Sequence, residues 1–363
     1  MSGSPEEYHS LDIFAIPPEA YELNERDRKK VVDNLIKTNK GPFAPNSLAH
    51  AAEISVAEQI LVNVLLLVLM GGPLAWFSFV APAVWIFGSW YSVTMYVLFT
   101  LVLSLHPIPY RGNFCHYLWK SGIQKACFRY FSYRAVWTGD ALERVRACQP
   151  YLGAGVPHGV LPFANLLSIS AINLFTFTGT FVGAPASVTF NTPFLRYFTM
   201  LGTCDCSREV VAKEIERGNS VGVVPDGIAG IFRCNDGDEV CFLKSRKGLA
   251  KLSLKTGAPI VPAYSLGNTA VFKAWFDKWG IMERISRKAQ LSIFLFWGKF
   301  GLPIPLRTPI TTIFGPPIEV TQTDNPTQEE IDDVHRRLLQ GVEDCFNQHK
   351  AALGWGHKTM RIV

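Results

Sequence analysis

The chain has 363 residues and a net charge of +5, with 12% aromatic and only 18% charged residues. Its mean hydropathy is positive at +0.15, so we expect part of the chain to be surrounded by lipid rather than by water. Lys and Arg are dispersed without a long basic block, which argues against a nucleic-acid partner and favours anionic lipid or a phosphorylated small molecule.

The eight cysteines form no CxxC pair, and Cys204 and Cys206 lack the His-rich partner motif that would complete a zinc site. We therefore predict reduced, structural thiols and no metal ion. The first strongly apolar run begins near Gln59, after a polar N-terminal region. This arrangement predicts no cleavable signal peptide and a cytosolic catalytic part.

The N-terminal residues 1–54 are polar and contain several prolines. They predict a flexible cytosolic leader with one helix around residues 25–38. We see no chemistry in this segment.

The longest apolar stretch, residues 59–110, contains no Asp, Glu, Lys or Arg. It is long enough for two helices of about 20 residues, the length needed to cross a bilayer. We predict a transmembrane or re-entrant helical hairpin over residues 55–106; the alternative is a buried helical pair of a soluble domain. Basic residues flank both ends of the stretch, which predicts that both termini are cytosolic.

The following segment, residues 107–147, begins with a part rich in Lys, Arg and aromatic rings. Residues 111–139 include no acidic residue. We predict that this segment lies in the lipid headgroup layer. The alternative is an ordinary packed helix with a solvated basic face.

From residue 148 to residue 350, short apolar strands alternate with helical patterns, which predicts an α/β domain with a central, mostly parallel sheet. A short C-terminal tail, residues 351–363, follows. The expected strands cover residues 151–156, 221–224, 260–264 and 310–314. The expected helices cover residues 161–174, 207–217, 247–256 and 327–349, the last with Thr327 as N-cap.

One histidine, His158, stands between an expected strand and the next helix in "YLGAGVPHGVLP". Pro157 stiffens this turn, and Gly159 allows close backbone approach. At a helix N-terminus the dipole disfavours imidazolium, which would keep a neutral nitrogen ready to accept a proton. A structural histidine is an equally good interpretation of this motif alone.

A competing motif is "GNSVG" at residues 218–222, a literal GxSxG. The nucleophile elbow of hydrolases needs a strand before the serine and a helix after it. Here a helix precedes Ser220 and a strand follows. We therefore interpret Gly218 as a helix C-cap rather than part of a serine hydrolase site.

A carboxylate and a group of cations complete the candidate site. Asp226 follows an expected strand in "VVPDGIAGIF", at the end of a sheet where ligands usually bind, although Asp before Gly is also a common turn former. Further on, Arg246, Lys247 and Gly248 stand at a helix start, which suits phosphate. A solvated basic face is the alternative for these cations.

Together these motifs resemble the type 2 diacylglycerol acyltransferase family, which includes monoacylglycerol and wax-alcohol acyltransferases and is related to the glycerol-phosphate acyltransferases. The resemblance covers roughly residues 107–349. It rests on motifs in family order: "YLGAGVPHG", "NTPFLRYFTMLGTCDCSRE", "VVPDGIAGIF", "RKGLAKLSLKTGAPIVPAYSLG", "FWGKFGLPIP" and "ITTIFGPPIEV".

The resemblance implies an acyl-CoA-dependent diacylglycerol O-acyltransferase with His158 as base and no covalent intermediate. Asp226 is the candidate for orienting the imidazole, with Asp205 and Glu209 as alternatives. Arg246, Lys247 and Gly248 are expected to bind the acyl-CoA co-substrate. The residues expected to position substrate are Pro157, Gly159, Arg208 and Gly227. Expected partners are acyl-CoA, a neutral acylglycerol and membrane lipid, with no tightly bound cofactor and with homo-oligomerisation open. The expected location is the endoplasmic reticulum membrane, with the lipid droplet surface also open.

Three positions depart from the pattern of the family and its relatives. Val156 replaces the first histidine of the histidine-proline-histidine-glycine signature, Gly230 stands near a family glutamate, and Phe163 stands where the glycerol-phosphate enzymes have an aspartate. These departures keep open a monoacylglycerol, wax-alcohol or lysophospholipid acceptor. They also keep open an inactive, membrane-bound lipid-binding protein.

Overall fold

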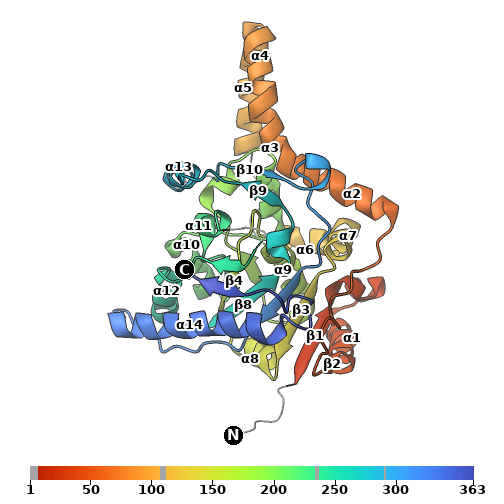
Figure 1. Ribbon diagram of the computed structural model, residues 1–363, viewed down its shortest axis with the longest axis vertical. Helices are drawn as coiled ribbons and strands as arrows, with labels where there is room; N and C mark the ends of the chain where they lie inside the picture. Colours follow the sequence, from red (N-terminus) through yellow and green to blue (C-terminus); the bar gives the residue numbers. More distant parts are fainter. Residues whose placement is uncertain (1–6, 107–111, 234–236, 290–291) are drawn as a thin grey trace.

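The computed structural model describes residues 7–106, 112–233, 237–289 and 292–363. Its centre is an eight-stranded sheet with the order β2-β1-β3-β11-β8-β4-β6-β5. The pairings β4–β8, β4–β6, β5–β6 and β11–β3 are parallel, and the other three are antiparallel. Helices pack on the sheet, and α4 and α5 project from one end of the molecule (Figure 1). The predicted α/β fold with a mostly parallel sheet is confirmed.

The strands and helices of the described chain have the following bounds. The strands are β1 (Tyr8–Asp12), β2 (Lys40–Gly41), β3 (Arg134–Thr138), β4 (Leu152–Val156), β5 (Phe181–Gly183), β6 (Ser220–Val223), β7 (Glu239–Cys241), β8 (Ile260–Leu266), β9 (Lys273–Trp275), β10 (Leu295–Trp297), β11 (Thr311–Phe314) and β12 (Met360–Ile362). The α-helices are α1 (Glu25–Thr38), α2 (Val56–Leu66), α3 (Gly72–Ala75), α4 (Ala81–Phe87), α5 (Trp90–Leu105), α6 (Gly112–Lys120), α7 (Gly122–Tyr130), α8 (Ala141–Ala147), α9 (Phe163–Ala171), α10 (Arg208–Glu216), α11 (Gly227–Ile231), α12 (Gly248–Thr256), α13 (Ile281–Ala289) and α14 (Gln328–His349).

The strands β8, β4 and β6 form the buried parallel part of the sheet. Leu152 of β4 lies opposite Ile260 of β8 and Val221 of β6, and all three side chains are fully buried. Helices on both faces require apolar residues on both sides of such strands, which explains their continuous apolar sequence. The parallel direction brings the carboxyl ends of the three strands to one edge of the sheet.

The N-terminal region is not the flexible leader that its composition predicts. β1 pairs along its length with β3, and Leu11 and Ile13 are buried in the main core. The predicted helix over residues 25–38 is present as α1, which buries Val32 and Ile36. The polar residues of this region form its outer face, while a minority of apolar residues is enough to pack it on the sheet.

The predicted headgroup segment is also largely part of the folded domain. α7 buries Phe128 and Tyr130, and β3 takes its place in the sheet between β1 and β11. The alternative of a packed helix therefore holds for residues 122–130, and residues 134–138 form a strand instead. The part of the segment over residues 107–111 lies outside the described residues. At the other end of the chain, β12 pairs with β7, so the predicted tail is a sheet element.

The apolar stretch forms one continuous helix over Val56–Phe87, long and apolar enough to cross a membrane, followed by the shorter helix α5. Its first part packs on the domain, where Val62, Leu66 and Met70 enter the core. The chain turns after Phe87, and α5 returns along the second part, where Trp76 stacks on Tyr96 at 4.9 Å. Arg196 is buried at the end of α5 and donates to the carbonyls of Leu103 and His106, which ties α5 to the domain.

Candidate active site

Three neighbouring parallel strands deliver polar side chains to the same edge of the sheet. His158 follows β4, Asp226 follows β6 and Asn268 follows β8. Ligands of open α/β sheets bind outside the carboxyl ends of the strands, which is this edge. The sequence predicted His158 and Asp226 here and missed Asn268.

The His158 side chain is partly buried, and its Nδ1 lies 3.0 Å from the carbonyl oxygen of Gly159. A carbonyl oxygen only accepts, so Nδ1 carries the proton and Nε2 keeps a lone pair. Burial lowers the pKa of His158, which favours the neutral ring at neutral pH. The ring therefore has the tautomer that a general base needs.

The cause of this neutral state differs from the one predicted. α9 begins only at Phe163, after Pro162, so His158 stands in a loop ahead of the helix rather than at its first turn. Burial of the ring is the largest cause of the lowered pKa of His158. Phe163 stands where the glycerol-phosphate enzymes have an aspartate. Its ring packs in the core against Phe131 and Phe272, with ring centroids 5.0 and 6.0 Å away.

Asp226 is fully buried and holds the backbone of the histidine loop. Its Oδ2 accepts the N–H of His158 at 3.0 Å, so the expected contact with the imidazole is replaced by a contact with the main chain. Burial raises the pKa of Asp226 to about 7, and the N–H groups of His158, Asp226 and Gly227 and the charge of Arg246 partly oppose this effect. Asp226 is a positioning residue in this geometry, and the ring is oriented by the Gly159 carbonyl.

The position of the Asp226 side chain explains why residue 230 is a glycine. A Cβ on Gly230 would lie 2.2 Å from Oδ2 of Asp226, far inside van der Waals contact. The carboxylate that supports the histidine loop thus occupies the space that a side chain at position 230 would need. Val156, the other departure from the family signature, is fully buried in β4 opposite Tyr264.

Asn268 fixes the same loop from the other side. Its Nδ2 donates to the carbonyls of Pro157 at 3.1 Å and His158 at 2.9 Å, and its Oδ1 accepts the N–H of Ala164 at 3.1 Å. Gly159, with φ at +65°, passes close to this amide, because a Cβ there would lie 2.7 Å from Nδ2. The signal in the sequence was a polar residue after the apolar strand 260–266, the pattern that also identified Asp226.

The predicted cations gather where α10 and α12 begin. Nη2 of Arg208 lies 3.3 Å from the position of a Cβ on Gly248, the first residue of α12. The guanidinium of Arg246 stacks over Phe242 at 5.1 Å. Lys247 instead forms an ion pair with Asp332 of α14 at 2.7 Å.

Gly227 and Ser220 belong to two further motifs noted in the sequence. Gly227, with φ at +50°, begins α11 directly after Asp226. Ser220 is the first residue of β6, and its Oγ accepts the N–H of Tyr151 at 3.2 Å. A buried serine at the start of a strand has the wrong position for a nucleophile elbow.

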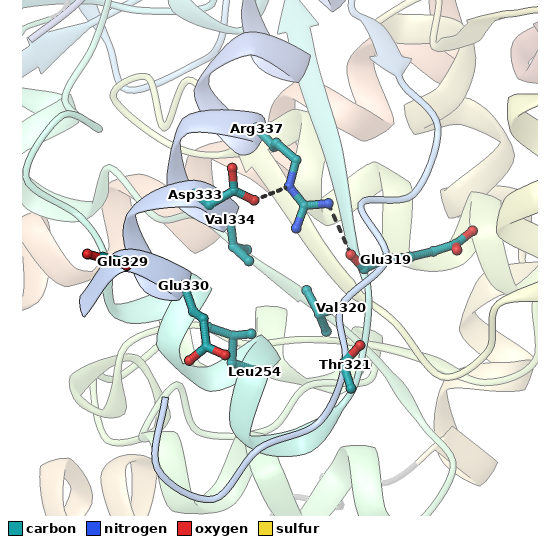
Figure 2. A pocket seen from close by; sticks show the side chains of 9 residues that line it. All are labelled: Leu254, Glu319, Val320, Thr321, Glu329, Glu330, Asp333, Val334 and Arg337. Atoms are coloured by element: carbon teal, nitrogen blue, oxygen red, sulfur yellow. Dashed lines mark hydrogen bonds and ion pairs between the residues drawn. The ribbon is translucent and has the colours of Figure 1, made fainter. Parts of the chain in front are cut away.

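A separate surface pocket of about 560 Å³ lies between the end of α12, residues 319–321 and the start of α14 (Figure 2). Arg337 closes one side with an ion pair to Asp333 at 3.0 Å and a hydrogen bond to the carbonyl of Glu319 at 3.1 Å. Glu330 belongs to the N-terminal capping box of α14. The remaining carboxylates repel phosphate, so this pocket does not suit an acyl-CoA.

The part of the chain that the structure describes holds no group of three or more His, Cys, Asp or Glu side chains that could bind a metal ion. Cys127, Cys148, Cys204, Cys206 and Cys345 form no disulfide bond.

Comparison with known proteins identifies the family. The family model described as diacylglycerol acyltransferase matches residues 83–363. The chain belongs to this family. The resemblance noted from the motifs is thereby confirmed, and the chain is an acyltransferase of the type 2 diacylglycerol acyltransferase group.

Relatives of this chain are named for different activities. Diacylglycerol O-acyltransferase 2 of Danio rerio is 31% identical over 64% of this chain and 69% of its own length. Diacylglycerol O-acyltransferase 2-like protein 6 of Bos taurus is 29% identical over 62% of this chain and 72% of its own length. Acyl-CoA wax alcohol acyltransferase 2 of Mus musculus is 27% identical over 88% of this chain and 95% of its own length.

One solved structure is also similar, the 1-acyl-sn-glycerophosphate (LPA) acyltransferase of Thermotoga maritima. It is 16% identical, with a TM-score of 0.38 over 80% of this chain and 97% of that one.

Proposed function

We propose that this family member transfers a fatty acyl group from acyl-CoA to the free hydroxyl of diacylglycerol, forming triacylglycerol. The observation that carries the proposal is the neutral His158 ring with its Nε2 lone pair at the carboxyl edge of the parallel strands. The relatives named as diacylglycerol O-acyltransferases support the acceptor.

In the proposed reaction, Nε2 of His158 removes the proton of the acceptor hydroxyl while its oxygen attacks the thioester carbonyl. The tetrahedral intermediate collapses with loss of the C–S bond, and the imidazolium gives its proton to the departing thiolate. No covalent intermediate is required, because a thioester is already activated. Asp226 and Asn268 hold the loop so that His158 needs little reorganisation during the reaction.

Coenzyme A carries phosphate groups that need cations outside the apolar part of the site. We assign this role to Arg246 and Arg208 beside the N-terminus of α12, with Gly248 allowing close approach. Lys247 can bind phosphate together with Arg246 and Arg208 only when its ion pair with Asp332 breaks. Neutral acylglycerol needs no such charges, so these residues act on the donor.

The proposed location is the endoplasmic reticulum membrane, with both termini cytosolic and the lipid droplet surface as a further location. The segment from Gly72 to Phe87 and α5 each have 16 residues, about 24 Å at 1.5 Å per residue. A hydrocarbon core is about 30 Å thick, which favours a re-entrant hairpin over a spanning one. β1 before the hairpin pairs with β3 after it, which supports one side for both ends.

A wax alcohol is the second candidate acceptor. The wax alcohol acyltransferase of Mus musculus aligns with 88% of this chain, a longer stretch than the diacylglycerol enzymes named above. Both acceptors present one hydroxyl at the end of a lipid, so the same base serves either. Monoacylglycerol and lysophospholipid are further acceptors of the same chemistry.

The test is an acceptor panel with the purified full chain in lipid vesicles. Labelled oleoyl-CoA is supplied with diacylglycerol, monoacylglycerol, fatty alcohol or lysophosphatidic acid, and the product is quantified. We expect the highest kcat/KM with diacylglycerol. A preference for fatty alcohol would replace the acceptor and keep the reaction.

The base is tested in the same assay with His158→Ala. We expect a loss of about a hundredfold to ten-thousandfold, the usual contribution of a general base. Ser220→Ala is the matched control and should keep most activity. Full activity of His158→Ala would refute the mechanism, and inactivity of the wild-type chain on every acceptor would favour a lipid-binding protein.

A further inference from the structure

A second apolar surface lies beside the base of the projecting helices. β9, β10, α13 and the short turn at Lys299–Gly301 lie at the end of the molecule from which α4 and α5 project (Figure 1). Pro303 follows this segment, and its Cγ is 2.9 Å from the position of a Cβ on Gly71, at the foot of those helices. The segment over residues 273–302 is therefore continuous with the apolar helices.

The two-stranded ribbon of this segment has one outward face. Trp275 pairs with Leu295 and Lys273 with Trp297, and all four side chains are exposed. The residues between them point the other way, and Phe296 packs against the core at 5.1 Å from Phe272. A strand alternates its side chains, so the exposed face is a continuous patch of indole, Leu and Lys.

α13 adds a second row to this patch. Ile281 and Ile285 are exposed and four residues apart, so they lie on one face of the helix. Trp279, just before the helix, is 76% exposed, and Phe300 is 87% exposed. We call Trp275, Trp279, Ile281, Ile285, Leu295 and Phe300 the flanking surface.

The charges around the flanking surface are mostly positive. Residues 273–302 contain six Lys or Arg and two acidic residues. Both acidic side chains have structural partners: Asp277 accepts the N–H groups of Ile281 and Met282, and Glu283 pairs with Arg233 at 2.9 Å. Exposed basic residues beside Trp are typical of a membrane interface, where the ring lies at headgroup level and the cation meets phosphate.

We propose that the flanking surface rests on a bilayer containing anionic phospholipid, with its apolar side chains at the acyl boundary and its Lys and Arg at the headgroups. This inference rests on the proposed insertion of α4 and α5 and adds a second contact with the same membrane. Lipid is favoured over a second copy of the chain because the surface continues into helices that lack charged residues altogether.

The contact also determines which part of the domain faces the membrane. α13 packs against α11, the helix that begins directly after Asp226. Phe232, which follows α11, lies between Phe276 and Phe294 of the segment, at 5.0 and 5.8 Å. A membrane on the flanking surface thus lies next to the elements that carry the site.

The experiment places an environment-sensitive fluorescent amino acid at Trp279 of the full chain, reconstituted in vesicles with brominated acyl chains. Two reporters accompany it, one at Val102 in α5 and one at Glu143 in α8, which lies at the other end of the molecule (Figure 1). We expect quenching at positions 279 and 102 and none at 143. The quenching at 279 should grow with the phosphatidylserine fraction and shrink in Arg284→Glu/Lys288→Glu.

The outcomes separate the inference from the proposed anchoring. Quenching at 102 without quenching at 279 would refute the flanking contact and leave the hairpin in the membrane. A change at 279 that depends on protein concentration but not on brominated lipid would assign the surface to a second copy and overturn the proposal. Absence of quenching at 102 would refute the anchoring itself.

Discussion

At the scale of single residues, the site depends on the main chain around His158 as much as on the ring. One carboxylate and one amide, from Asp226 and Asn268, bond to the loop from neighbouring strands. The ring itself is held by the carbonyl of Gly159. Substitutions at these positions should therefore affect the placement of the base more than the binding of substrate.

The first prediction concerns the pH dependence of activity. Burial lowers the pKa of His158, so the acid limb of kcat/KM should have its midpoint below about 6.5, the ordinary value for histidine. Stopped assays from pH 5 to pH 8 in buffered vesicles would measure it. Asp226→Asn should keep this limb; if the limb vanished in that variant, Asp226 would be the titrating group.

The second prediction concerns stability. Burial raises the pKa of Asp226 to about 7, so the folded state holds a proton that the unfolded state loses near pH 4. The stability contributed by protonated Asp226 is complete below about pH 4 and falls by up to about 1.4 kcal/mol per pH unit as pH rises to about 7.

Thermal unfolding across this range tests the sign of the effect. Asp226→Asn should flatten the pH dependence, and the exposed control Asp324→Asn should not. A wild-type stability that rises relative to that of Asp226→Asn as the pH goes from 4 to 7 would contradict the prediction.

The third prediction concerns Asn268. Asn268→Ala leaves two buried carbonyls without their donor, a loss of about 1–3 kcal/mol for each such group. Asn268→Asp should be worse, because a carboxylate oxygen would face both carbonyls. We expect a lower kcat with little change in either KM, together with a shifted acid limb. A fall in thermal stability with an unchanged pH profile would indicate a structural role only.

At the scale of elements, the proposed phosphate-binding site lies at the start of α12. α12 begins at Gly248 with Arg208 against it and Arg246 just before it, while Lys247 is directed to α14. The sequence predicted the helix and its cations. It could not predict the ion pair with Asp332, because that contact joins residues far apart in the chain.

The fourth prediction follows from this difference. Arg246→Ala should raise the KM for acyl-CoA more than Lys247→Ala does, and neither should change the KM for diacylglycerol. The defect of Arg246→Ala should be smaller with an acyl-pantetheine donor, and the wild-type donor KM should rise with ionic strength. Equal effects of the two variants, or an equal effect on both substrates, would argue against phosphate binding by Arg246.

Local sequence patterns predicted helices and strands, whereas contacts between residues far apart in the chain could not be predicted from them. The alternation of apolar and polar residues located β4, β6, β8, β11 and α14 to within a few residues. Composition did not predict β1, because five residues can pair in a sheet without an apolar run around them. Asn268 was missed because its amide acts on a loop more than a hundred residues away in the sequence.

At the scale of the whole molecule, the hairpin and the sheet are joined at several points. Arg196 holds the end of α5, and the Phe194 ring lies 6.1 Å from Trp76 near the foot of the hairpin. The α/β domain and the apolar helices therefore form one packed unit rather than a domain joined to the helices by a loose tether.

The fifth prediction concerns the depth of the hairpin. Ser89 lies at the turn between the two helices, and a re-entrant hairpin keeps it inside the bilayer. Ser89→Cys in sealed microsomes should therefore resist an impermeant maleimide from both sides and react after detergent, whereas the exposed thiol of Cys206 reacts from the cytosolic side. Intact-protein mass with peptide mapping gives the sites, and labelling of Ser89→Cys from the lumen would show a spanning hairpin.

The pairing of β1 with β3 also has a consequence for synthesis on the ribosome. Roughly 120 residues, including the whole hairpin, separate these two strands in the chain. At about 5–20 residues per second, β1 leaves the ribosome roughly 6–24 s before its partner exists. The whole hairpin is therefore synthesised while the N-terminal strand is still unpaired, so β1 can join the sheet only after the hairpin has left the ribosome.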